Sequence, residues 1–300
     1  MFRLCVFLVL VGWSPPSWAG VEITPSEVFA EAVRIEKEVN LIKDHLGITA
    51  VKTVVPTRTQ FLPRHSWQIG YLVLIKINFF RRQQGLPTLV PNNLNPVLEL
   101  EPVVVYEQTQ RILMEISLVK KRLGIVGEVP PQEVIPGKKP MDVVNKLLFI
   151  SGQWDIINQG KLTPQDSYAE VKRLSDDVGI ILNHLKIQDT AFPPAQLSDA
   201  KPSDSLASAY VVLAEVQRLQ QQLSIPRVDF EPFRKTMDIE AEDVFNIVIL
   251  IVAELQTIKA SLGLEADLTP PARKHRDKSP SDVNQLLGYV ANRLRLIHSL

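Results

Sequence analysis

The chain has 300 residues and carries 33 Lys and Arg against 33 Asp and Glu, so its formal net charge is zero. A neutral chain has no overall field that attracts nucleic acid or an acidic membrane surface, and we expect no nucleic-acid partner. Hydrophobic residues make up 45% of the sequence, which suits a protein stabilised by its core. Cys5 is the only cysteine, which excludes an intrachain disulfide framework.

Residues 1–19 have the pattern of a secretory signal peptide. Arg3 precedes an apolar run from Leu4 to Trp13, and small residues precede the expected cleavage after Ala19. The apolar run is too short to cross a membrane as a helix. The rest of the chain has neither a cysteine nor an Asn-x-Ser/Thr site, which favours bacterial export over the eukaryotic secretory pathway. We therefore expect a protein that is exported across the inner membrane into the bacterial periplasm.

The remaining sequence repeats itself. Residues 25–48 (PSEVFAEAVRIEKEVNLIKDHLGI) return without a gap as residues 164–187 (PQDSYAEVKRLSDDVGIILNHLKI). The separation of Pro25 from Pro164 along the chain defines a repeat offset, and the same offset relates Tyr71 to Tyr210, along with many other positions. We interpret the chain as two homologous units, residues 20–161 and 162–300.

Each unit contains four predicted helix starts. Proline is tolerated at the first position of a helix, and an acidic residue two positions later suits the positive end of the helix dipole. Most starts have this proline, and five also have the acid, as in Pro25-Ser-Glu27. The eight predicted starts are Pro25, Pro63, Pro102, Pro140, Pro164, Pro202, Ala241 and Pro280.

Apolar residues then recur in steps of three and four, which is typical of helices packed in a bundle. Several helices end in Leu-Gly-Ile or Leu-Gly-Leu, where glycine can adopt the left-handed conformation. The second helix, around residues 67–84, has a broad apolar face and is predicted to be buried on more than one side. The run 244–253 is too short for a membrane span and indicates a buried helix. The predicted fold is all-α, a tandem duplication of a four-helix unit with eight long helices.

The connections between these helices are long and contain prolines, as in residues 49–62 and 265–279. About 15 extended residues reach roughly 50 Å, whereas a helix of about 23 residues is only about 35 Å long. An extended connection could therefore return the chain to the level at which the previous helix began. Parallel helices would follow, although an antiparallel bundle with generous loops remains open.

Two histidines, His45 and His184, occupy equivalent places in the two copies. One hypothesis is a repeated metal or proton-transfer site. The other is that each imidazole interacts with the negative end of its helix dipole, which we favour because no further ligands stand at a metal-binding spacing. We expect no metal and no cofactor.

Two local clusters of cations remain. Arg81 and Arg82 lie at the end of the second predicted helix, and Arg273, Lys274 and Arg276 lie in the last long loop. They are candidates for contact with an anionic partner or lipid head group. The alternative is that they are solvated surface charges, which the neutral chain favours.

No catalytic residue is predicted. The recurring acids Asp142, Asp166, Asp204 and Asp282 are explained by their places at helix starts, and the serines lack a nucleophile elbow. We therefore expect a non-catalytic periplasmic binding or scaffold module for another envelope protein. The alternatives are a protein that binds an apolar small molecule or lipid inside a unit, and an envelope hydrolase. The sequence leaves the oligomeric state open.

Overall fold

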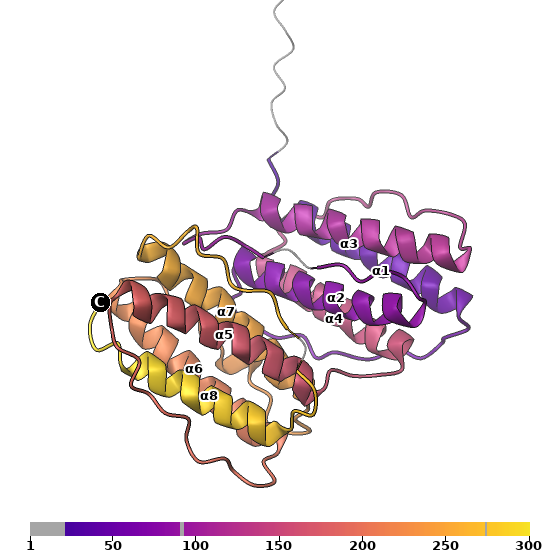
Figure 1. The fold of residues 1–300 in the computed structure, drawn as a ribbon. Coiled ribbons are helices and arrows are strands. Elements are labelled where there is room, and N and C mark those ends of the chain that lie inside the picture. The colour runs from indigo at the N-terminus through magenta and orange to yellow at the C-terminus, as the bar shows by residue number, and fades with distance from the viewer. Residues whose placement is uncertain (1–21, 91–92, 274) are drawn as a thin grey trace, which may run out of the picture.

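The computed structural model describes residues 22–90, 93–273 and 275–300. These residues form eight α-helices and one short 3₁₀ turn, Glu231–Phe233, and they contain no strand. The all-α prediction is confirmed (Figure 1). The predicted signal peptide lies outside the described residues. The helices are α1 (Pro25–His45), α2 (Pro63–Gln83), α3 (Pro102–Leu123), α4 (Pro140–Asn158), α5 (Pro164–His184), α6 (Pro202–Gln222), α7 (Ala241–Ser261) and α8 (Pro280–Arg295).

All eight helices begin at the predicted residues, and an acidic side chain caps the first turn of six of them, namely α1, α4, α5, α6, α7 and α8. In α1 a Glu27 carboxylate oxygen accepts a hydrogen bond from the Thr24 amide at 2.8 Å, and in α8 Asp282 accepts from the Ser279 amide at 2.9 Å. Each bond satisfies a backbone N–H at the helix start, and each carboxylate places negative charge at the positive end of the dipole.

The helices with a predicted Leu-Gly stop end at a glycine with left-handed backbone. Gly47, Gly124 and Gly263 have φ values of 69°, 74° and 75°. After α5 and α6 the same place is taken by Lys186 and Ser224, each with φ of 56°. The reversal lets the next amide turn back onto the last helical turn, so the chain leaves each helix in a defined direction.

The helices pack into two four-helix bundles with the same scheme of neighbours. In the first bundle α1 and α2 each contact α3 and α4, and in the second α5 and α6 each contact α7 and α8 (Figure 1). The N-terminal turns of all four helices meet at one end of each bundle, so all four run parallel. This arrangement resolves the orientation that the sequence left open. The residues at these ends are Pro25, Pro63, Pro102 and Pro140 in the first bundle and Pro164, Pro202, Ala241 and Pro280 in the second.

Parallel helices require the chain to return along the bundle, and the extended connections do this. Their backbone groups are bonded by side chains of the helices. Asn78 of α2 donates to the Leu89 carbonyl at 2.8 Å and accepts from the Leu89 amide at 2.9 Å. At the equivalent place in the second unit, Gln217 of α6 donates to the Val228 carbonyl at 2.8 Å. These bonds satisfy peptide groups that packing against the helices removes from water.

A buried ion pair joins the first and third helices of each bundle. Lys120 of α3 bonds Glu38 of α1, and Lys259 of α7 bonds Asp177 of α5 at 2.6 Å. Asp177 and Lys259 are completely buried. Asp177 also accepts hydrogen bonds from the Thr269 hydroxyl and the Gln256 amide, at 2.6 and 2.9 Å. The carboxylate is therefore surrounded by donors that replace water.

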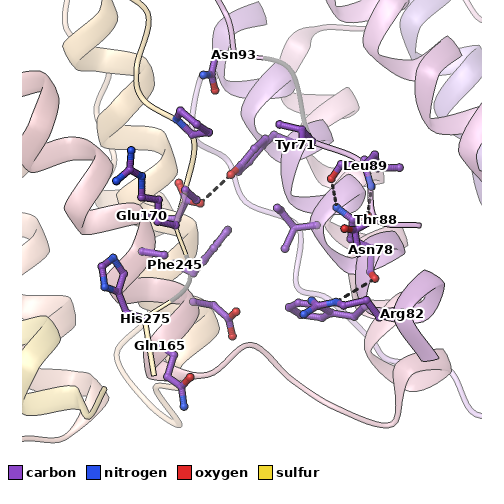
Figure 2. A pocket seen from close by; sticks show the side chains of 18 of the residues that line it. Tyr71, Asn78, Arg82, Thr88, Leu89, Asn93, Gln165, Glu170, Phe245 and His275 are labelled. Atoms are coloured by element: carbon purple, nitrogen blue, oxygen red, sulfur yellow. Dashed lines mark hydrogen bonds between the residues drawn. The ribbon is translucent and has the colours of Figure 1, made fainter. Parts of the chain in front are cut away.

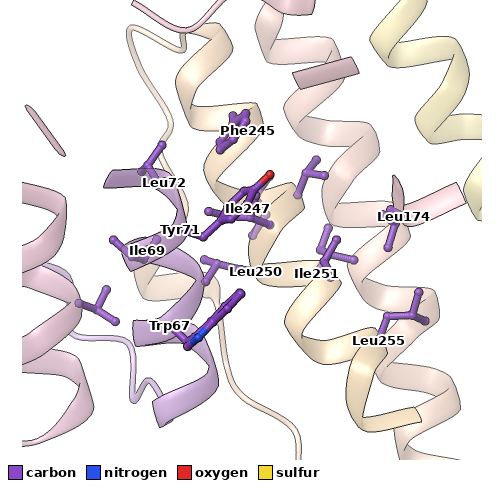
Figure 3. Close-up of a cluster of buried hydrophobic side chains, with 14 of the residues drawn as sticks. Trp67, Ile69, Tyr71, Leu72, Leu174, Phe245, Ile247, Leu250, Ile251 and Leu255 are labelled. Atoms are coloured by element: carbon purple, nitrogen blue, oxygen red, sulfur yellow. The ribbon is translucent and has the colours of Figure 1, made fainter. Parts of the chain in front are cut away.

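The two bundles are joined through α2 and α7. Every residue of α7 from Val244 to Ala260 is buried, as predicted for its apolar run, because one face packs in its own bundle and the other against α2 (Figure 3). By length and composition α7 could cross a membrane, but 94% of its most apolar window is buried inside the protein. Helix α2 is likewise buried on more than one side, as predicted.

Replacing Asp177 with alanine is expected to lower the free energy of unfolding by about 3–5 kcal/mol, because Lys259 would remain as a buried charge without its carboxylate. Urea denaturation followed by circular dichroism measures the change. The neighbouring substitution Asp176→Ala is the control, since its pair with Lys172 is partly exposed, and it should cost less than about 1 kcal/mol. A similar loss in the two variants would contradict the structural role of the buried pair.

Candidate functional site

Helices α2 and α7 form the contact between the two bundles, which we call the junction, and they run antiparallel there. Buried charged side chains pair at both ends of the junction. At one end Arg64 donates to both carboxylate oxygens of Glu254, at 2.8 and 3.2 Å, and the His65 Nε2 atom lies 2.6 Å from Glu254 Oε1. Arg64 and His65 open α2, whereas Glu254 lies in the last part of α7. Gln220 of α6 also donates to Glu254 at 2.8 Å, so this carboxylate links both bundles.

A four-membered ring of charges closes the other end. Lys76 of α2 lies 2.6 Å from both Asp155 of α4 and Glu242 of α7. Lys52, from the connection between α1 and α2, reaches the same two carboxylates at 2.7 and 3.2 Å. Two cations and two anions therefore neutralise one another at the junction. Lys52, Lys76 and Asp155 belong to the first bundle, and Glu242 belongs to the second.

An apolar contact lies between these two ends. Figure 3 shows Trp67 and Tyr71 of α2 facing Ile247 and Leu250 of α7. Trp67 is 5% exposed and so belongs to this contact. Apolar burial and the charges at both ends hold the two bundles in a fixed orientation.

His65 is the best-defined titratable group at the junction. Its Nδ1 atom accepts a hydrogen bond from the Leu62 amide at 2.9 Å, so Nε2 carries the proton that is donated to Glu254. Burial lowers the pKa of His65 despite the nearby carboxylate. Burial opposes ionisation of Glu254, but hydrogen bonds from His65 and Arg64 hold its pKa at about 2.

A groove of about 790 Å³ lies beside the junction, between the two bundles (Figure 2). One wall consists of the second half of α2 with residues 88–90 and Asn93 of the connection that follows it. The other consists of the first turns of α5 with residues 271–273, His275 and Arg276 of the connection between α7 and α8. Residues from both bundles therefore build one site.

The floor of the groove is a closed polar network. The Tyr71 hydroxyl donates to Glu170 at 2.8 Å, as Figure 2 shows, and Arg173 donates to the other oxygen of Glu170 at 2.5 Å. Arg173 also donates to the Tyr71 hydroxyl at 3.0 Å and to Asn93 at 3.2 Å. Burial raises the pKa of Tyr71 well above its usual value, so the phenol remains protonated. The single negative charge of Glu170 is thus matched by Arg173.

The rim of the groove carries arginines that, unlike Arg173, have no carboxylate partner among the described residues. Arg82 stacks over the Phe79 ring, 4.8 Å from its centroid, and Arg273 and Arg276 are exposed. Among residues 22–90, 93–273 and 275–300, no carboxylate lies within 4.0 Å of these three guanidinium groups. The Nε2 atom of His275 is buried and has no hydrogen-bond partner within the same residues.

The two cation clusters identified in the sequence therefore meet in part. Arg82 from α2 and Arg273 and Arg276 from the last connection line the same groove. Lys274 lies outside the described residues. Arg81, the other candidate of the first cluster, does not line the groove, because it points into the first bundle, where it pairs with Glu115 and donates to the Pro87 carbonyl at 2.8 Å.

His45 and His184 are exposed at the C-terminal ends of α1 and α5, in different bundles, and neither lines the groove. The described residues contain no group of three or more His, Cys, Asp or Glu that could hold a metal ion. The positions of both histidines are those required for the helix-dipole interpretation.

Sequence analysis did not identify the floor residues Tyr71, Glu170 and Arg173 as part of a site. A signal was present, because Glu170 and Arg173 have Glu31 and Arg34 as their equivalents in the first unit. In the first bundle that pair is looser, with 3.6 Å between Arg34 and Glu31. Repetition of a charged pair at positions three apart can therefore indicate a buried network.

A second cavity, of about 670 Å³, also lies between the bundles, next to the ring of Lys52 and Glu242. Asn246 of α7 lines it, and its buried Oδ1 atom has no hydrogen-bond partner among the described residues. The charges around this cavity are mixed, so it gives no comparable indication of ligand chemistry.

Comparison with protein-family models, with curated proteins and with solved structures gives no match to this chain.

The stability of the protein is expected to fall on acidification below about pH 6.5. Unfolded His65 titrates near 6.5, whereas its folded pKa is lower, so below pH 6.5 the unfolded chain binds a proton that the folded chain does not. Glu254 adds to the loss at lower pH, because its stabilisation is present above about 4.5 and disappears as the pH falls toward its folded pKa of about 2.

Urea unfolding between pH 7.5 and 4.5 measures this dependence, with a slope of up to about 1.4 kcal/mol per pH unit for one proton. His65→Asn should make the dependence shallower between pH 6.5 and 5, although it lowers stability at pH 7.5 by removing the bond to Glu254. The exposed substitution Gln188→Asn removes no titratable group, so it serves as the control and should leave the profile unchanged. An unchanged slope in His65→Asn would exclude His65 as the titrating group.

Proposed function

We propose that this protein is a non-catalytic binding module of the bacterial periplasm that presents the groove between its two bundles to another protein. The observation that carries the proposal is the groove of about 790 Å³, whose rim arginines have no carboxylate partner among the described residues. Buried charges are costly unless paired, and those of the junction are paired. Exposed, unpaired arginines beside a concave surface are a common means of recognition.

The rigidity of the junction supports this function. At one end of the junction Glu254 bonds Arg64 and His65. At the other end Lys76 pairs with Asp155 and Glu242. The walls of the groove come from different bundles, so their spacing depends on this junction. A groove fixed before binding costs less entropy on association than one that a partner must assemble.

The location of the cavities favours binding of a partner protein. It gives less support to the alternative, in which an apolar ligand binds inside one bundle. The stripe residues in the bundle interiors, such as Ile35, Ile112 and Val178, are completely buried. The voids at the N-terminal ends of the bundles measure about 10 Å³ each, roughly the room for one water molecule. The larger spaces described above lie between the bundles.

Hydrolysis has less support than binding. Glu170 is the buried carboxylate of the groove floor. Both its oxygens accept hydrogen bonds, one from Tyr71 and the other from Arg173. A general base needs a free lone pair directed at a substrate or water. Glu170 instead orients the phenol and the guanidinium.

We infer that the two bundles arose by duplication of one four-helix unit. The shared neighbour scheme supports this, as does recurrence of the pair Glu38–Lys120 as Asp177–Lys259 at the repeat offset. The proposal of export depends on the pattern of residues 1–19. Fractionation of the host cell for the protein, with cytoplasmic and periplasmic markers, tests that part separately.

Site-specific photo-crosslinking in the native host tests the binding function. A photoreactive residue at Gln165, which lines the groove at the start of α5, should yield an adduct with a specific protein. The matched control is Asn183, an exposed residue at the other end of the same helix, which should yield none. Absence of an adduct at Gln165 in folded protein, or equal adducts at both positions, would argue against the groove as a docking site.

A further inference from the structure

The cations of the groove stand on its two opposite walls. Arg82 comes from the α2 wall, and Arg273 and Arg276 come from the segment that forms the other wall. Figure 2 shows this opposition for two labelled residues, with Arg82 on the side of α2 and His275, the chain neighbour of Arg276, on the far side. A ligand lying in the groove therefore meets positive charge on both flanks.

Apolar surface separates these cations. Phe79 and Ile75 of α2, Val90 of the following segment and Phe245 of α7 line the groove between the two flanks. Arg82 covers the face of Phe79 in the free protein, so its guanidinium is already held near the groove. The surface combines an apolar strip with charge at its edges, which is the usual composition of a peptide-binding groove.

We propose that the groove recognises an acidic peptide segment of the partner protein, with Asp or Glu carboxylates bound by Arg82 on one wall and by Arg273 and Arg276 on the other. This inference rests on the proposed binding function and specifies the chemistry of its partner. Guanidinium groups bind carboxylates through paired, charge-assisted hydrogen bonds. Apolar side chains of the segment pack between them, against Phe79 and Val90.

The charges inside the groove favour this ligand. Glu170 is neutralised by Arg173, and Asp166 accepts hydrogen bonds from the Thr163 amide and hydroxyl at the start of α5, at 2.8 and 2.7 Å. The rim arginines have no carboxylate partner among the described residues.

A membrane surface fits the site less well than a peptide. The cations are divided between two walls of a concave site, whereas a lipid surface is met by cations on one convex or flat face. The chain is also neutral overall, so it lacks the broad positive field of proteins that bind anionic lipid. The groove accommodates a chain segment, and its volume of about 790 Å³ far exceeds that needed for a single inorganic anion.

Fluorescence anisotropy of labelled peptides tests the proposal with the full mature chain. The probe is a short peptide in which Glu alternates with Leu, and the comparison peptide has Gln in place of every Glu. The acidic peptide should bind more tightly, and added salt should weaken it. The triple variant Arg82→Gln, Arg273→Gln, Arg276→Gln should weaken binding by about tenfold or more, because several charge-assisted bonds are lost.

A second triple variant controls for net charge. Arg58→Gln, Arg122→Gln and Arg227→Gln remove the same number of exposed cations from positions that do not line the groove. This variant should bind the acidic peptide within about twofold of wild type, since distant surface charges are screened by salt. Far-UV circular dichroism and thermal unfolding establish that both variants are folded.

Four outcomes would overturn the proposal. They are equal loss of binding in the two triple variants, equal binding of the acidic and neutral peptides, no binding of the acidic peptide, and binding of anionic phospholipid vesicles that depends on the groove arginines while the peptide does not bind. If the Gln165 crosslink captures a protein but the acidic peptide does not bind, the binding function stands and acidic recognition is wrong. If both experiments fail, both proposals fail.

Discussion

The antiparallel contact of α2 with α7 is the interaction on which the whole arrangement depends. Within each bundle four parallel helices add their dipoles, which gathers positive ends at one face and negative ends at the other. The antiparallel junction places the two bundles with opposite polarity, so each partly compensates the other. Glu242, in the first turn of α7, and Asp155, in the last part of α4, then meet around Lys76. The groove exists because this junction holds two walls from separate bundles at a fixed spacing.

Several residues of the junction differ between the two halves of the chain. Ile247 and Leu250, which face α2, correspond at the repeat offset to Gln108 and Arg111 of α3. Lys76 corresponds to Glu215, which pairs with Arg295 at 2.8 Å. At these places α3 carries Arg111 instead of an apolar residue and α6 carries Glu215 instead of a lysine, so neither helix reproduces the surface that joins α2 to α7. Positions shared at the repeat offset build each bundle and also supply Tyr71, Glu170 and Arg173 to the groove floor.

Local features of this fold could be predicted from the sequence, and features that depend on distant partners could not. Helix starts and stops follow from prolines, capping acids and glycines within a few residues. The parallel arrangement was left open because loop length allows either direction, and the deciding bonds, such as those from Asn78 to Leu89, form only in the folded chain. Arg81 and Arg82 look alike as a dipeptide. Only the folded chain distinguishes them, because Arg81 is buried and pairs with Glu115 whereas Arg82 is exposed.

The distribution of charge partners distinguishes the parts of the site that maintain structure from those that are free to bind. Glu254, Lys76 and Glu170 are buried, and each has at least two partners, because an unpaired charge in these places would cost several kcal/mol. The rim guanidinium groups of Arg82 and Arg276 remain in contact with water, so leaving them unpaired costs little before a ligand arrives. Their desolvation cost arises only on binding, when a carboxylate can offset it. A neutral, rigid floor with solvated cations at the rim therefore favours ligands that bring their own negative charge, and it does so without destabilising the free protein.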